Sequence, residues 1–201
     1  SPNQSGTGQA KININNAQVQ QLIQEGISAQ VAAAIIARRG GGFTTLGEAL
    51  RTPGMDANSA GIIVDRFTLN QQERLTGRIN VNTASRAVLS TIPGIATDIA
   101  EGIYSRQSAG IANLSELFSI PGVTPESLAD SIDLLTVGSD TFLVRSMGIA
   151  GNTTVSLEAV VRIFEDGPRV IKIYEMPQKD MAYAWRWSDT TTNEIDLGAA
   201  N

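Results

Sequence analysis

The stretch INVNTASRAVLSTIPGI, residues 79–95, decides how this chain folds. Asn82 or Thr83 is expected to cap a helix, because either side chain can accept hydrogen bonds from the free amides of a first helical turn. Pro-Gly at 93–94 predicts a turn, and apolar residues at helical spacing predict a second helix over 97–107. The stretch therefore predicts two short helices joined by a tight glycine turn.

A looser copy of this pattern stands near the start of the chain. Matching positions keep a constant offset along the sequence, apart from one short gap within the repeat. The matches include Asn13 to Asn15 with Asn80 to Asn82, Gly26 with Gly94, Arg38 with Arg106, and Pro53-Gly54 with Pro121-Gly122. Because the register holds over the whole length, each copy predicts four short helices in two helix-hairpin-helix motifs. The turn glycines of the four hairpins are Gly26, Gly54, Gly94 and Gly122.

From residue 140 the apolar period changes to 2, which is typical of strands. Apolar residues alternate with polar ones over 155–163, which predicts a half-buried strand. Further strands are expected over 142–149, 169–175 and 181–187. The end of the chain therefore predicts a small antiparallel meander.

The fold class that follows is α+β, with two tandem helix-hairpin-helix (SAM-like) helical units before a small antiparallel β-sheet. The expected organisation is a disordered start at 1–10, repeat 1 over 11–69, a linker over 70–77, repeat 2 over 78–137, the meander over 138–187 and a polar tail over 188–201.

The 201 residues include no cysteine and no histidine. Their absence excludes disulfides, thiol nucleophiles, Cys/His zinc sites and histidine-based catalysis. We therefore expect no enzyme, no catalytic or metal-binding residues and no cofactor. An enzyme that uses carboxylates alone is a further alternative, for which the sequence shows no constellation.

The hairpins raise the question of nucleic-acid binding. In a phosphate-binding hairpin, a Gly-apolar-Gly turn lets backbone amides approach the phosphate, and the next helix adds its dipole. All four hairpins keep the first glycine, but Ser28, Asp56, Ala96 and Thr124 stand where the second would be. Because a side chain at this position obstructs close approach, the pattern favours hairpins that pack.

Charge favours the same interpretation. Repeat 1 has a net charge of +1, repeat 2 of −3, and residues 138–201 of −3. Phosphate neutralisation supplies most of the affinity of a sequence-independent DNA binder, so a basic face is needed. Arg38 and Arg39 form the local basic cluster, and they are the candidate contacts if the hairpins do bind nucleic acid.

Trp185 and Trp187 alternate with Arg186, which places both indoles on one strand face. They are expected either to cover the sheet or to form a partner surface, since tryptophan is enriched in binding hot spots.

Repeat 2 and its continuation resemble the helical domain of the type II secretion system minor pseudopilin K family (general secretion pathway protein K). The residues that carry the resemblance are Ile79 to Ser85, Leu89, Pro93-Gly94, Ala100 to Arg106, Leu114 to Leu117, Pro121-Gly122, and Leu134 to Ile149 running into Val155 to Ile163. The junction from helices into strands distinguishes this family from competence-type DNA-uptake proteins, which share the first half of the pattern.

The resemblance implies a membrane helix upstream of Ser1 and a helical domain inserted in a pilin-like sheet. It also implies a place at the tip of a pseudopilus, on the periplasmic side of the bacterial inner membrane, in contact with other minor pseudopilins or exported substrate. Calcium is implied as well, but its ligands cannot be assigned to residues of this chain. The leading hypothesis is thus a non-catalytic structural and assembly component of protein secretion. The alternative is a helix-hairpin-helix nucleic-acid-binding protein of the DNA uptake or repair type.

Overall fold

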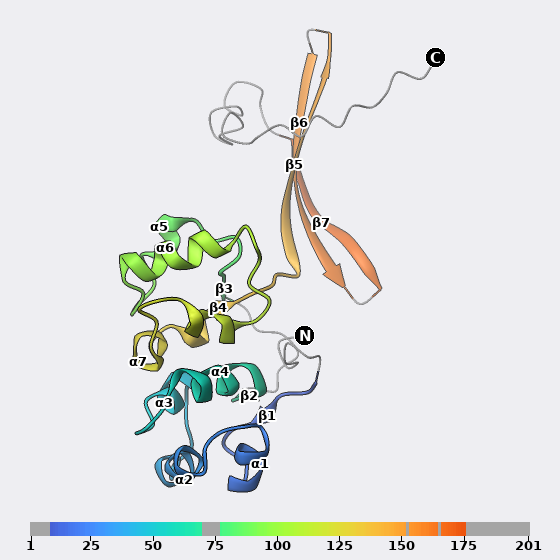
Figure 1. Ribbon diagram of the computed structural model, residues 1–201. Helices are drawn as coiled ribbons and strands as arrows, with labels where there is room; N and C mark the ends of the chain where they lie inside the picture. Colours follow the sequence, from blue (N-terminus) through green and yellow to red (C-terminus); the bar gives the residue numbers. More distant parts are fainter. Residues whose placement is uncertain (1–8, 70–76, 152, 165, 176–201) are drawn as a thin grey trace. The chain divides into compact units, whose positions relative to one another are not determined.

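The computed structural model describes residues 9–69, 77–151, 153–164 and 166–175 (Figure 1). The chain divides into two compact units, a helical region within residues 1–138 and a sheet region within residues 139–201. The first contains short helices and the second an antiparallel sheet. The predicted α+β class is therefore confirmed.

The helical region is built from two copies of one plan. Repeat 1 consists of β1 (Ile12–Asn13), α1 (Val19–Gln24), α2 (Ala29–Arg38), α3 (Leu46–Leu50), α4 (Ala57–Arg66) and β2 (Phe67–Thr68). Repeat 2 consists of β3 (Ile79–Asn80), α5 (Arg86–Leu89), α6 (Thr97–Arg106), the 3-10 helix η1 (Leu114–Ser119), α7 (Pro125–Leu128), the 3-10 helix η2 (Ile132–Leu134) and β4 (Leu135–Thr136). A parallel pair of short strands joins the two ends of each repeat, β1 with β2 and β3 with β4.

Neither Asn82 nor Thr83 caps the first helix of repeat 2, so that prediction is wrong. The helix begins later, and its N-cap is Ser85, whose hydroxyl accepts from the amide of Val88 at 3.3 Å. The Asn82 side chain instead pairs with the backbone of Ile111, accepting from its N–H at 2.8 Å and donating to its carbonyl at 2.8 Å. Asn82 therefore ties the start of the repeat to the loop after α6.

Repeat 1 contains the same bridge. Asn15 accepts from the amide of Phe43 at 2.8 Å and donates to its carbonyl at 2.9 Å. Asn15 is the counterpart of Asn82 in the aligned repeats, and Phe43 is the counterpart of Ile111. The internal repeat therefore extends from the sequence to individual hydrogen bonds.

Each repeat has its own hydrophobic core. The largest buried side chains of repeat 1 are Ile14, Leu22, Ile27, Ile35, Leu50, Ile63 and Phe67, and those of repeat 2 are Leu89, Ile103, Leu117, Leu128 and Ile132. Leu114 and Phe118 pack against both cores, and Ile132 packs with the core of repeat 1. The repeats therefore share apolar contacts and form one helical region (Figure 1).

The sheet region has three described strands, β5 (Thr141–Ala150), β6 (Thr153–Phe164) and β7 (Gly167–Glu175), in the order β5-β6-β7. All neighbours are antiparallel, with a bulge between Val160 and Val161. These strands match the first three that the sequence predicts, whereas the fourth, over 181–187, lies outside the described residues. In the part of the chain that the structure describes, no helix has the length and apolar character needed to cross a membrane.

Candidate functional site

The four turn glycines adopt backbone conformations that other residues rarely reach. Their φ angles are +101° at Gly26, +80° at Gly54, +77° at Gly94 and +85° at Gly122. Space is limited at the third turn as well, where a Cβ on Gly94 would lie 2.3 Å from the carbonyl oxygen of Ser127. Backbone geometry alone therefore explains a glycine at each turn.

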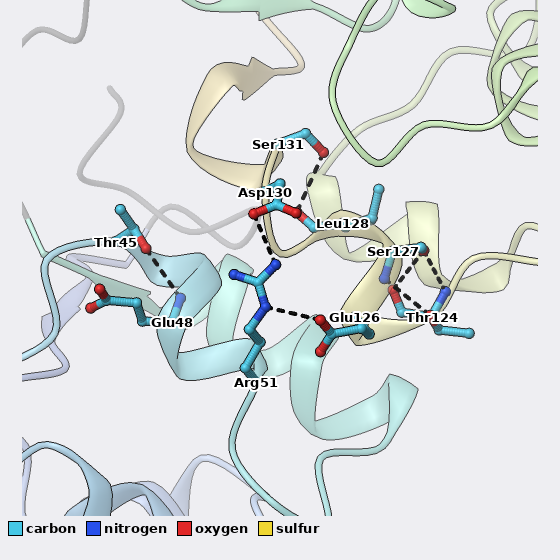
Figure 2. Close-up of polar contacts among 9 residues, drawn as sticks. All are labelled: Thr45, Glu48, Arg51, Thr124, Glu126, Ser127, Leu128, Asp130 and Ser131. Atoms are coloured by element: carbon cyan, nitrogen blue, oxygen red, sulfur yellow. Dashed lines mark hydrogen bonds and ion pairs between the residues drawn. The ribbon is translucent and has the colours of Figure 1, made fainter.

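The residue that replaces the second glycine is the N-cap of the following helix in all four hairpins. In three of them its side chain accepts a hydrogen bond from a helix amide: Ser28 from Val31 at 3.3 Å, Asp56 from Ser59 at 2.8 Å and Thr124 from Ser127 at 3.1 Å, the last drawn in Figure 2. A phosphate at these helix ends would compete with the cap for its amide. The caps therefore favour a structural role for the hairpins.

The remaining hairpin, the third in the chain, lies between α5 and α6 and lacks a side-chain cap because its N-cap is Ala96. It carries an acidic residue instead, Asp98, in the first turn of α6. A Cβ on Gly122 would lie 3.5 Å from an oxygen of this carboxylate, so Asp98 lies beside the turn of the next hairpin. The negative charge complements the helix dipole and disfavours a phosphate there.

Arg39 is a structural residue. Its Nη1 donates to the carbonyl oxygens of Ile14 at 2.8 Å and Ala17 at 2.6 Å. Arg38, by contrast, lies exposed in the last turn of α2. The structure thus separates the two members of the predicted basic pair, because Arg38 is exposed whereas Arg39 is half-buried and bonded to backbone carbonyls.

The other basic residues described in the helical region are also engaged by the protein. Lys11 donates to Val64, Arg78 to Leu135, and Arg106 to Ser119, while Arg51, Arg66 and Arg86 form ion pairs with Glu126, Glu25 and Glu101. Partial burial lowers the pKa of Lys11 and of Arg78. Among the described residues of this region, Arg38 is the basic side chain most available to an anion.

The junction between the repeats is quasi-symmetric. α3 contacts α7, and α4 contacts η1. In the alignment of the two repeats, α3 corresponds to η1, and α4 begins at the counterpart of α7. Each repeat therefore offers the other the same pair of elements, as in an isologous dimer interface.

One side of this junction is closed by Arg51 (Figure 2). Its Nε lies 2.9 Å from Glu126 Oε1, and its Nη2 lies 2.8 Å from Asp130 Oδ1. Nearby, the amide of Gly47 donates to Asp133 at 3.2 Å. The contact is close, because a Cβ on Gly47 would lie 1.7 Å from the carbonyl oxygen of Ala129.

The other side of the junction is an open groove of about 370 Å³. Its lining is Glu25, Ala57, Asn58, Gly61, Ile62, Asp65, Arg66 and Ser115. In the alignment of the two repeats, Arg51 corresponds to Ser119, Glu126 to Asn58 and Asp130 to Ile62. The residues that form the ionic bridge therefore have no charged counterparts on this side.

Glu25 in the groove is paired with Arg66. Two contacts join them, Nε to Oε2 at 2.6 Å and Nη2 to Oε1 at 3.2 Å. The hydrogen bond from Arg66 lowers the pKa of the Glu25 carboxyl, so the pair stays ionised into the acid range. This geometry fits a stabilising ion pair between the end of α1 and the end of α4.

One face of the sheet is apolar and exposed. The strand register puts Phe142, Val161 and Val170 in one row, and Val144, Ala159 and Ile173 in the next. Seven apolar side chains of this face are 40–60% exposed, namely Phe142, Val144, Val155, Leu157, Ile163, Val170 and Ile173. The strand predicted over 155–163 is confirmed as part of β6, and its apolar side chains Val155, Leu157 and Ile163 are 40–46% exposed.

The other face of the sheet is more polar. Arg145 pairs there with Glu158 at 3.0 Å across β5 and β6, and the Nζ of Lys172 lies 4.4 Å from the ring centroid of Tyr174. Leu143 lies on this face as well, one residue from Val144. We call the side with the seven exposed residues the apolar face. Large exposed apolar patches rimmed by polar residues mark interaction sites in proteins.

Trp185 and Trp187 lie outside the described residues. Among the residues that are described, no group of three or more acidic side chains is placed to hold a metal ion.

Comparison with known proteins supports the hairpin assignment. Residues 8–68 match the family model described as a helix-hairpin-helix motif. This range covers repeat 1, where both hairpins have the geometry described above. No curated protein and no solved structure matches the chain. The chain thus carries a helix-hairpin-helix motif, which is compatible with either nucleic-acid binding or protein contacts.

Proposed function

We propose that this protein is a non-catalytic assembly component that acts through protein–protein contacts. The observation that carries the proposal is the apolar face of the sheet, whose seven side chains are 40–60% exposed. A three-stranded sheet needs an apolar face buried against another element to be stable. A protein partner supplies such a cover, whereas a nucleic acid does not.

The helical region supports the same function as a scaffold. Its turn glycines serve the backbone, three of its four hairpin caps bond their own helix amides, and its arginines are mostly engaged within the protein. A region of this kind can act as a structural part of a larger assembly without a catalytic site of its own.

The finer proposal is a minor pseudopilin of type II protein secretion, resting on the resemblance at 79–95 and at the junction into β5. In this proposal the protein lies on the periplasmic side of the inner membrane, at the tip of the pseudopilus. Its partners are other minor pseudopilins, which would contact the apolar face.

The test compares two positions on one strand. Val144 and Leu143 are neighbours on β5 with 47% and 51% of their surface exposed, and they point to opposite faces. We expect Val144→Glu combined with Ile173→Glu to abolish co-purification with minor pseudopilins and to block secretion in a strain lacking the gene. Leu143→Glu is the matched control and should retain both.

Circular dichroism of each variant checks that the helical region stays folded. Wild-type protein that captures no minor pseudopilin, together with intact secretion in the deletion strain, would overturn the pseudopilin proposal. Capture of minor pseudopilins by the double glutamate variant as well as by Leu143→Glu would show that the contacts lie outside the apolar face.

Nucleic-acid binding is the second candidate function, and the helix-hairpin-helix match over residues 8–68 is the observation that favours it. The test is fluorescence anisotropy with a labelled DNA duplex at low and high salt. The variant is Arg38→Gln with Arg39→Gln, and Arg86→Gln on α5 is the control. Binding that falls with salt and is weakened only by the double variant would establish this candidate; no binding at low salt would exclude it.

A further inference from the structure

We draw no further inference here: the strongest candidate, the open groove between α4 and η1 lined by Glu25, Asn58 and Ser115 among others, carries nothing because Arg66 already pairs with its Glu25 carboxylate and nothing in the structure shows what would enter it.

Discussion

Arg39 and Gln107 occupy the same place in the two repeats and make the same pair of hydrogen bonds. Arg39 donates to the carbonyl oxygens of Ile14 and Ala17 at 2.8 and 2.6 Å. Gln107, its counterpart in repeat 2, donates to those of Val81 and Ala84 at 2.7 and 2.8 Å. Because a neutral amide does in repeat 2 what a guanidinium does in repeat 1, the positive charge of Arg39 is dispensable for this contact.

The first prediction follows from this equivalence. Arg39→Gln should preserve both hydrogen bonds and change the free energy of unfolding by less than about 1 kcal/mol, whereas Arg39→Ala leaves two carbonyls without their donor and should cost about 1–3 kcal/mol. Urea unfolding followed by circular dichroism measures both. Arg38→Ala is the exposed control, expected within about 0.5 kcal/mol of wild type. If the glutamine variant is as unstable as the alanine variant, the two positions are not equivalent.

The second prediction concerns the close approach at Gly47. A Cβ there would lie 1.7 Å from the Ala129 carbonyl oxygen, so Gly47→Ala must push α3 and α7 apart. We expect a loss of about 2 kcal/mol or more in the free energy of unfolding. Gly61 is the comparison at the other side of the junction, because its Cβ would lie 3.3 Å from that of Ser115.

Gly61→Ala should therefore change stability by less than about 1 kcal/mol, since the helix gains from alanine what the mild crowding costs. Gly40→Ala is a second control, because nothing lies within 4 Å of its Cβ position. Equal stability of the Gly47 and Gly40 variants would show that the repeats do not approach as described.

The third prediction tests the ionic bridge at the junction. The Arg51 side chain is 33% exposed, and those of Glu126 and Asp130 are 71% and 59% exposed, so water and salt screen the bridge strongly. Arg51→Ala should cost only about 0.5–1 kcal/mol of unfolding free energy near 0.15 M salt.

Near 1 M salt, the cost of removing Arg51 should shrink further, since the Debye length falls to about 3 Å. The measurement is urea unfolding of both proteins at the two salt concentrations. Arg51→Lys distinguishes charge from geometry, because a lysine keeps the charge but cannot reach both carboxylates with a rigid fork. A cost that grows with salt would contradict an electrostatic bridge.

The fourth prediction is a dependence of stability on pH at Glu25. Its carboxyl pKa is lower in the folded protein than the ordinary value of 4.5, chiefly because Arg66 donates a hydrogen bond to the carboxylate. The unfolded state therefore binds the proton more readily, and the pair's contribution is fully present above pH 4.5. It is lost as the pH falls through the folded-state pKa.

Thermal unfolding of wild type and Glu25→Gln from neutral to strongly acidic pH measures this dependence. The wild type should melt higher at neutral pH, and the gap should close in acid. Glu101→Gln, which removes a carboxylate paired with Arg86 at 50% side-chain exposure, is the control and should show a smaller gap. A gap of constant size at every pH would mean that the substitution acts through packing.

The sequence by itself determined the features that depend on local pattern. Glycines at four hairpin turns follow from the positive φ that each turn imposes on its own residue. Local sequence patterns also predict the internal repeat, the change of apolar period near residue 140 and the first three strands. A fold class rests on such local periods, which is why α+β could be predicted.

Only the tertiary structure decided which residues meet across long separations. Asparagine is a common helix cap, but the side chain of Asn82 bonds to the backbone of Ile111. Arg51 of repeat 1 pairs with Glu126 of repeat 2. In the sequence, Arg39 appears as one of two adjacent basic residues, whereas in the structure it donates hydrogen bonds to two backbone carbonyls. Its alignment with the neutral Gln107 could have revealed this structural role.

The exposure of Val144 and Ile173 could not be predicted from the sequence either. Alternation of apolar and polar residues shows that a strand has an apolar side, but not what covers that side. Local pattern fixes backbone conformation, whereas a side chain's role depends on the partner that the fold brings to it.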